Sequence, residues 1–205
     1  MTGGRHAEKA ARIPPLPPEE WPGEMRDAIA ALRPPVVRHP LPPRGGSRPK
    51  GLNVLGTLAR HPALTRAFNT FNGHILFGTT LSPRQRELLV LRVAAVRQSE
   101  YEWAQHAVLA ADAGIDADEV RRIAEDPGAP EWAALDRALL AAADELLKEA
   151  TVSEATWAAL ADELDEQQLM DVVFTVGAYD TLAMAFRSFG VAVDDDLRDW
   201  KPASP

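Results

Sequence analysis

The segment that decides the fold reads Glu87-Leu-Leu-Val-Leu-Arg-Val-Ala-Ala-Val-Arg-Gln-Ser99-Glu100-Tyr101-Glu102-Trp103-Ala-Gln-His106. It predicts two helices joined by a short connection at residues 97–99. If this connection folds the helices back antiparallel, Glu87 in the first helix can reach His106 in the second. Glu102 and His106 are four residues apart, so their side chains lie on one face of the second helix. The segment therefore predicts two carboxylates and an imidazole that lie close together.

Such a group of side chains suits proton transfer. Carboxylates stabilise a cationic imidazole, and a carboxyl group buried beside other acids is pushed towards its protonated form. Together they can take a proton from one atom of a substrate and deliver a proton nearby. The spacing alone is not specific, because an exposed Glu–His pair four residues apart is common and contributes only about 0.2–0.5 kcal/mol. From the spacing alone, both a proton-transfer site and a solvated helix face remain possible interpretations.

The same segment resembles the core motif of the carboxymuconolactone decarboxylase and alkylhydroperoxidase D superfamily. The peroxidase branch of that superfamily has a Glu, then a Cys-x-x-Cys, then a His four residues beyond the second Cys. Here Glu87 and His106 keep their places, but Ser99 and Glu102 stand where the cysteines would be, and the chain has no cysteine. Thiol peroxidase chemistry requires a thiolate. The sequence therefore resembles the cysteine-less decarboxylase branch more closely.

The resemblance implies an all-α fold of the alkylhydroperoxidase D-like type, in which Glu87, Glu102 and His106 are catalytic. It implies a carboxy-lyase or isomerase-like enzyme that performs decarboxylation, isomerisation or lactone chemistry on a small organic acid or lactone, without a cofactor. It also implies a homo-oligomer, a trimer or a hexamer. The alternative is an alkylhydroperoxidase-like protein that has lost its Cys-x-x-Cys and acts as a non-catalytic oligomeric binding protein.

Four residues near the motif or in the last helix are candidates for substrate binding: Ser99, Tyr101, Trp103 and Arg187. Ser99 either donates a hydrogen bond to a substrate oxyanion or caps the second helix. Tyr101 and Trp103 point to opposite sides of Glu102. Tyr101 is the better pocket candidate because it has a hydroxyl group to place, whereas Trp103 fits a core position.

Charged residues outside the motif allow two interpretations. Asp180 lies in an apolar helix and needs a partner if it is buried, and Arg187, two turns later on the same face, is expected to supply it. Alternatively Arg187, Arg84 or Arg92 binds a substrate carboxylate through two parallel hydrogen bonds.

A metal site has little support from the sequence. His74, His106, Glu87 and Glu102 include the ligand types of a non-haem iron or zinc site. The sequence has no His-x-His or His-Glu-x-x-His spacing, however. We expect neither a metal nor another cofactor.

The composition excludes several classes of protein. A chain of 205 residues with 46% hydrophobic residues can form one domain with a real core. Its net charge of −8 argues against a nucleic-acid partner. No run approaches the roughly eighteen consecutive apolar residues of a membrane helix, and the first residues lack the apolar segment of a secretory signal. We expect a cytoplasmic protein with no membrane partner.

The chain divides into three regions. Residues 1–51 form an arm, since eleven of the seventeen prolines lie within residues 1–50, with a short helix predicted at residues 22–32. The arm is expected to wrap around its own domain or a neighbouring subunit. Residues 52–193 form the carboxymuconolactone decarboxylase-like all-α domain, and residues 194–205 form a frayed tail.

Capping residues predict where the helices of the domain begin and end. Helices are expected at residues 62–77, 83–96, 100–113, 131–149, 154–163 and 166–189, with a short one that starts at Asp116 and ends near residue 125. The first of these is predicted to bury one apolar face, formed by Leu64, Phe68, Phe71 and Ile75. The last is apolar on nearly all sides, so we expect it to be central and to pack against another subunit as well.

Overall fold

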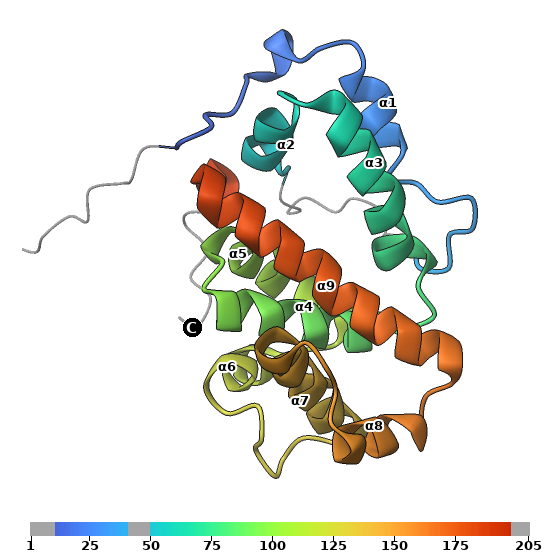
Figure 1. Cartoon of the computed structure of the whole chain (residues 1–205). Helices are drawn as coiled ribbons and strands as arrows, with labels where there is room; N and C mark the ends of the chain where they lie inside the picture. Colours follow the sequence, from blue (N-terminus) through green and yellow to red (C-terminus); the bar gives the residue numbers. More distant parts are fainter. Residues whose placement is uncertain (1–10, 41–49, 198–205) are drawn as a thin grey trace, which may run out of the picture.

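The computed structural model describes residues 11–40 and 50–197, and the regular secondary structure of this part of the chain is all helical (Figure 1). The α-helices are α1 (Met25–Ala30), α2 (Leu52–Leu58), α3 (Pro62–Gly73), α4 (Pro83–Arg97), α5 (Glu100–Ala110), α6 (Ala117–Glu125), α7 (Ala134–Glu149), α8 (Glu154–Ala161) and α9 (Glu166–Phe189). Short helical turns follow residue 17 (η1, Pro18–Glu20), α3 (η2, His74–Gly78, π-helical), α5 (η3, Ala111–Ala113) and α9 (η4, Asp195–Leu197). The predicted all-α fold class is confirmed.

Local capping explains most helix boundaries. Ser82, Asp116 and Asp165 begin α4, α6 and α9 through capping boxes, in which the cap side chain accepts from the third helical residue and that residue's side chain bonds back. Gly114 and Gly190 end their segments in the left-handed conformation, with φ of +74° at both. These starts and stops are the ones that the sequence predicts.

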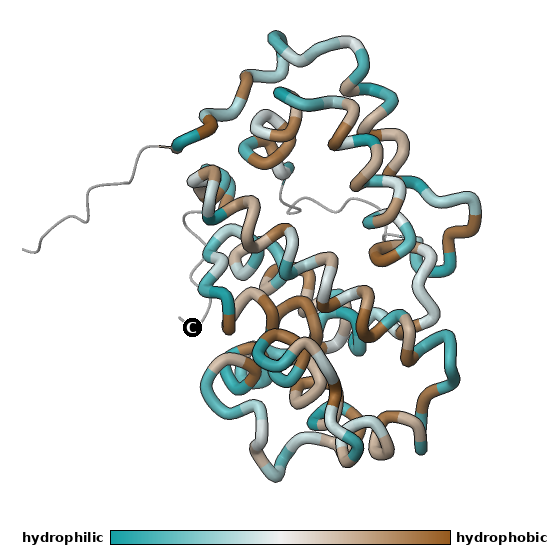
Figure 2. The backbone as a smooth tube through the Cα atoms, viewed as in Figure 1, coloured by the Kyte–Doolittle hydropathy of each residue, from teal (hydrophilic) through white to brown (hydrophobic). Residues whose placement is uncertain are grey.

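Helix α4 is the centre of the fold, because it contacts α5, α6, α7 and α9. A run of fully buried apolar side chains lies along it: Leu88, Leu89, Val90, Leu91 and Val93. Figure 1 shows α9 crossing the molecule, with α1, α2 and α3 on one side and α6, α7 and α8 on the other. Figure 2 shows hydrophobic stretches along α4 and the helices that cover it. Burial of this run on all sides accounts for the absence of an amphipathic pattern in α4.

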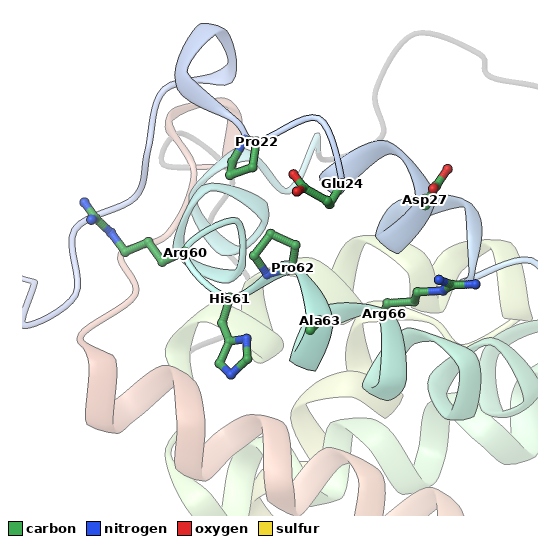
Figure 3. A pocket seen from close by; sticks show the side chains of 8 residues that line it. All are labelled: Pro22, Glu24, Asp27, Arg60, His61, Pro62, Ala63 and Arg66. Atoms are coloured by element: carbon green, nitrogen blue, oxygen red, sulfur yellow. The ribbon is translucent and has the colours of Figure 1, made fainter.

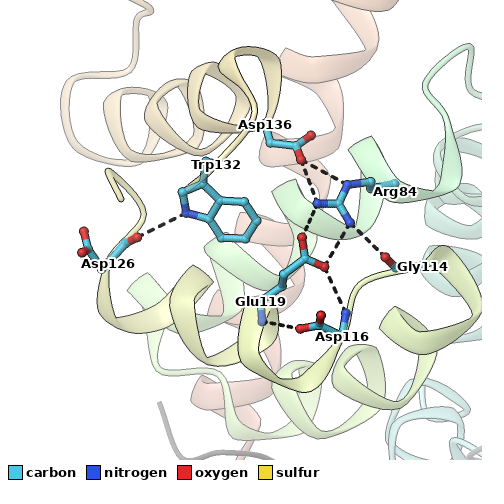
Figure 4. Close-up of polar contacts among 7 residues, drawn as sticks. All are labelled: Arg84, Gly114, Asp116, Glu119, Asp126, Trp132 and Asp136. Carbon is cyan, nitrogen blue, oxygen red and sulfur yellow. Dashed lines mark hydrogen bonds and ion pairs between the residues drawn. The ribbon is translucent and has the colours of Figure 1, made fainter. Parts of the chain in front are cut away.

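Two arginines of α4 join it to α6 and α7. Arg84 pairs with Glu119 of α6 at 2.6 Å and with Asp136 of α7 at 2.8 Å (Figure 4). Arg92 binds Asp144 of α7 through two hydrogen bonds of 2.6 and 2.9 Å. The sequence offered Arg84 and Arg92 as substrate clamps, but both guanidinium groups are engaged by carboxylates of their own chain.

The described part of the arm packs against its own chain. Leu16 N–H donates to Gly56 O at 3.0 Å, and the Asn69 amide donates to Ala28 O at 2.8 Å. Met25 and Ala28 of α1 form a small buried cluster with Ala59 of α2. The short helix predicted at residues 22–32 is therefore present as α1, and it covers α3.

Helix α3 buries a different face from the one that its apolar pattern predicts. Leu64 is 55% exposed and Phe71 is 37% exposed, so the prediction that they face the core is wrong for these two, whereas Ile75 is fully buried and Phe68 is half-buried. The buried side chains of α3 are instead polar: Thr65, Asn69 and Asn72. Thr65 and Asn69 satisfy their polar groups on backbone carbonyls, so this face can pack against α1.

The first residues after α9 are ordered, so the frayed tail predicted from residue 194 is wrong at its start. Asp194 is 4% exposed. One of its oxygens accepts from Asn53 N–H at 2.8 Å, and the other accepts from the Tyr101 hydroxyl at 2.9 Å. The Asp194 carboxylate thus holds the chain that follows α9 against α2 and α5. Residues 198–205 lie outside the described residues.

Helix α9 combines buried and exposed apolar side chains. By length and composition alone it could cross a membrane, with a hydropathy of 1.4 in its most apolar window, but half of that window is buried inside the molecule. A core helix passes the same test, and α9 packs on α4 and α7. On its outer side Met170, Phe174 and Met184 are each more than half exposed. The expected central position is therefore observed.

Two glycine substitutions test the packing of the arm. A Cβ at Gly73 would lie 2.4 Å from Leu32 O, whereas a Cβ at Gly177 on α9 would meet nothing within 4 Å. We expect Gly73→Ala to lower the free energy of unfolding by about 1–3 kcal/mol and to speed proteolysis of the arm. Gly177→Ala should raise it by up to about 1 kcal/mol through helix propensity. Equal stability of the two variants in urea denaturation would contradict the observed contact.

Candidate active site

A buried ion pair joins the two helices of the motif. Glu87 of α4 is 1% exposed, and its Oε2 lies 2.7 Å from His106 Nδ1 of α5. Arg86 donates from Nε and Nη2 to the other oxygen of Glu87, at 3.2 and 3.1 Å, and from Nη1 to Leu76 O. The predicted approach of Glu87 to His106 is thus present, and Arg86 is a further partner that the sequence reading missed.

The surroundings of Glu87 keep it ionised. Burial by itself would raise the pKa of this carboxyl, but the charges and hydrogen bonds of His106 and Arg86 outweigh burial and hold its pKa below the usual range. An ionised carboxylate can only accept, so Nδ1 of His106 carries the hydrogen of the shared bond. His106 Nε2 has no hydrogen-bond partner among the described residues, and it remains for a ligand.

The surroundings of Glu102 have the opposite effect on its carboxyl group and favour the protonated form. Glu102 is 2% exposed, and neither of its carboxyl oxygens has a hydrogen-bond partner. Burial raises the pKa of Glu102 to about 8, the nearby Ser99 hydroxyl lowers it somewhat, and the charge of Asp180 raises it. Ser99 Oγ lies near this carboxyl without reaching hydrogen-bond geometry. Glu102 is therefore a protonated carboxylic acid at neutral pH.

Glu102 and His106 line the same cavity, of about 230 Å³, which lies between α5 and α9 on one side and α2, α3 and the arm on the other. Ile29 and Leu32 of the arm form part of its wall. Its lining is mostly apolar, and the polar residues in it are Asn69, Asn72, Tyr101, Glu102, Gln105, His106 and Tyr179. A solvated helix face is therefore excluded for Glu102 and His106.

A second hollow, of about 620 Å³, lies between the start of α1 and the α2–α3 corner (Figure 3). Its lining carries both signs of charge, with Glu24 and Asp27 from the arm and Arg60 and Arg66 from the α2–α3 region. Arg60 donates to Pro14 O at 2.7 Å. This hollow contains none of the motif residues, so the smaller cavity is the candidate site.

Tyr179 of α9 is a member of the site that the sequence reading left without a role in it. Its ring meets that of His106 edge to face, with 5.0 Å between the centroids. Burial and the nearby charge of Glu87 raise the pKa of Tyr179 well above its usual value, so its hydroxyl remains a donor. The signal in the sequence was a tyrosine within an apolar helix, since a buried tyrosine hydroxyl needs a partner.

Tyr101 and Trp103 have separate roles. The ring of Tyr101 lines the cavity, but its hydroxyl donates to Asp194 and accepts from Gln105 at 3.0 Å. Trp103 is 3% exposed, belongs to the main apolar core and does not line the cavity. The structure therefore brings the Tyr101 ring to the site while its hydroxyl group secures the chain that follows α9.

Ser99 and Arg187 do not line the cavity. Both border a separate surface hollow at the end of α9. Ser99 occupies the N-cap position of α5, but its side chain makes no capping hydrogen bond. The predicted pair of Asp180 with Arg187 is wrong, because Asp180 binds Arg97 of α4 at 2.6 Å. Because α4 packs beside α9 in the same direction, Arg97 at the end of α4 lies closer to Asp180 than the next turns of α9 do.

His74 is separate from the motif. Its Nε2 lies 2.7 Å from Asp171 Oδ1, and Asp171 also accepts from Thr79 and from the backbone and side chain of Thr80. This network fixes η2 against α9. Among residues 11–40 and 50–197, no three His, Asp or Glu side chains are arranged to hold a metal ion.

Residues 62–145 match the model of the carboxymuconolactone decarboxylase family. The matched segment runs from the start of α3 into α7 and contains Glu87, Glu102 and His106. Among curated proteins, none matches the chain.

Several solved structures share the fold of this chain. The alkylhydroperoxidase AhpD core of a peroxidase-related protein from Ralstonia eutropha JMP134 is 21% identical, with a TM-score of 0.64, over 80% of this chain and 95% of that one. A peroxidase-related protein from Silicibacter sp. TM1040 is 16% identical, with a TM-score of 0.65, over 71% of this chain and 78% of that one. The debrominase Bmp8, as a Cys-to-Ala variant in complex with 2,3,4-tribromopyrrole, is 15% identical. Its TM-score is 0.67, over 94% of this chain and 96% of that one. At these identities the likeness shows the AhpD-like fold.

The raised pKa of Glu102 makes stability depend on pH in a defined direction. Between pH 4.5 and about 8 the folded chain keeps the Glu102 proton that the unfolded chain loses, so this residue lowers the free energy of unfolding as pH rises. Glu102→Gln removes the effect. We expect the free energy of unfolding of the variant, minus that of the parent, to increase by up to about 1.4 kcal/mol per pH unit across this range. Above this range the difference should level off.

Urea denaturation at a series of pH values measures this difference. Glu163→Gln, at an exposed position, is the matched control and should leave the pH dependence of the parent unchanged. A constant difference in stability between Glu102→Gln and the parent from pH 5 to about pH 8 would show that Glu102 is not a buried neutral acid.

Proposed function

We propose that the protein is a cofactor-free enzyme that moves protons on a small oxygenated molecule bound in the cavity of Glu102 and His106. One observation carries the proposal: a buried, protonated carboxyl group without a hydrogen-bond partner lines the same cavity as an imidazole oriented by a buried carboxylate. Burying a polar group without a partner costs stability. A ligand that bonds to Glu102 would offset that cost.

His106 and Glu102 suit different steps of the proton transfer. His106 Nε2 is the base, because Glu87 holds the hydrogen on Nδ1 and stabilises the imidazolium that forms. The proton leaves a carbon next to a carbonyl group and goes to Nε2, while the electron pair moves to the carbonyl oxygen. Glu102 donates a hydrogen bond to that oxygen. In a β,γ-unsaturated carbonyl compound, Nε2 then returns the proton to the γ carbon while the electron pair moves back from the oxygen, which completes an isomerisation.

Isomerisation or lactone chemistry fits the cavity better than decarboxylation does. Decarboxylation requires a bound carboxylate, and neither Arg nor Lys is among the described residues that line the cavity. A thiol-dependent peroxidase reaction is not proposed, because the chain has no cysteine to supply a thiolate. The non-catalytic binding role would use the same cavity but would not need a paired imidazole and a neutral acid within it.

Hydrogen–deuterium exchange tests the proposal without knowledge of the product. The protein is incubated in D2O with a panel of cyclic ketones and lactones, and exchange next to the carbonyl is followed by NMR. We expect catalysed exchange that falls by about a hundredfold or more in Glu102→Gln and in His106→Ala, as for removal of a general acid or base. Glu163→Gln should retain the rate. Undiminished exchange in both site variants would contradict the assignment of these residues.

The homo-oligomer implied by the resemblance stays a prediction, and an apolar patch supports it. Phe71 and Phe174 contact each other edge to face on the surface, and Met170 lies one turn from Phe174. An exposed apolar patch of this kind is typical of an interface. We expect light scattering to give an oligomer for the parent and a lower mass for Phe174→Glu. Trp157→Glu, at an exposed aromatic on α8, is the control and should keep the parent mass.

A further inference from the structure

A polar side chain opposite the catalytic groups is also without a partner. Asn72 of α3 lines the cavity and is 8% exposed, so more than nine-tenths of it is buried. Its Oδ1 has no hydrogen-bond partner. Asn69, one turn earlier, uses its amide on Ala28 O and thereby anchors the arm. Asn72 has no such structural use among the described residues, and leaving it unpaired costs stability.

The charges around the cavity restrict what can enter it. Arg86 lies nearby but is committed to Glu87 and Leu76, and Arg97 is committed to Asp180. His106 is the basic side chain in the described lining, and its Nδ1 is already bonded to the carboxylate of Glu87. An anionic ligand would lose its hydration here without gaining a cation.

We infer that the cavity selects a small uncharged molecule with an apolar body, whose polar end exchanges hydrogen bonds with the Asn72 amide and accepts one from the Tyr179 hydroxyl. The apolar walls that would hold the body include Ile29, Leu32 and Leu182. An asparagine amide both donates and accepts, so it suits a lactam, an amide or a hydroxy-carbonyl group. Asn72 thus determines specificity, and carboxylates are rejected.

This inference deepens the proposed function, since it names the ligand class for the same cavity. Three probes of nearly equal shape test separately the effects of a hydrogen-bond donor, a carbonyl group and a negative charge on the ligand. Benzamide is uncharged and carries a donor beside a carbonyl, acetophenone keeps the carbonyl without the donor, and benzoate replaces the group with a charge. Fragments of this size bind in the millimolar range at ordinary ligand efficiency, so NMR titration of the full chain at neutral pH is the suitable measurement.

We expect benzamide to bind more tightly than acetophenone by about threefold to tenfold, the size of one hydrogen bond, and benzoate to bind more weakly than either. Asn72→Leu, which is similar in size, should abolish the preference for benzamide over acetophenone, because it removes the Oδ1 acceptor that only the benzamide N–H can use. The variant should fold, because it removes an unpaired buried amide. If it does not fold, Asn72→Ser gives the same comparison. Tyr179→Phe should weaken both carbonyl ligands.

Several results would overturn the inference: no saturable binding of benzamide, benzoate binding as tight as benzamide, or an unchanged preference in Asn72→Leu. Glu102→Gln separates this outcome from failure of the proposed function. Gln keeps an uncharged side chain in the cavity, so this variant should still prefer benzamide although it no longer catalyses exchange. Exchange in the parent without the ligand preference rejects only the inference on substrate class. The preference without exchange rejects only the catalytic role.

Discussion

The pair of Glu87 with His106 is the interaction on which the rest of the site depends. A carboxylate that is 1% exposed within an apolar helix is tolerated only if its charge is neutralised by close partners. Arg86 supplies one partner from α4 itself, and His106 supplies the other from α5. The requirement fixes how α5 folds back on α4. It also fixes which nitrogen of the imidazole faces the cavity, so the packing of two helices and the orientation of the base have one cause.

The fold places two carboxyl groups of one motif in opposite states. Glu87 bonds to both His106 and Arg86 and has a lowered pKa, whereas the carboxyl of Glu102 is buried without a partner and has a pKa of about 8. Divergent environments for neighbouring acids are a general way of obtaining a base and an acid at one pH. In this chain the difference comes from His106 and Arg86, which bond to Glu87, and from the burial of Glu102 without a partner, to which the charge of Asp180 adds.

Local signals in the sequence predicted the helices well, because capping chemistry acts within four residues. The capping boxes at Ser82, Asp116 and Asp165 needed no knowledge of the fold. The approach of Glu87 to His106 was also predictable, since a short connection leaves few ways to pack two helices. Partners from distant segments were not predictable. Asp194 approaches Tyr101 across 93 residues, and Arg97 approaches Asp180 across 83.

Helix α3 shows why hydrophobic periodicity failed at one place. The pattern identifies the face that avoids water, but it does not say whether the chain's own core or another surface covers that face. In α3 the apolar residues Leu64 and Phe71 face outward, and the asparagines face inward to the arm and the cavity.

That inversion is costly for an isolated folding unit, since it exposes apolar surface and buries amides. It is consistent with a helix that serves two other purposes, contact with a further subunit on its outer face and recognition of a ligand on its inner face. Asn69 shows the structural use of such an amide, because its bond to Ala28 holds the arm in place. Asn72, one turn further along the same face, lies against the cavity with its Oδ1 unpaired, so the remaining reason for a polar residue there is the molecule that the cavity binds.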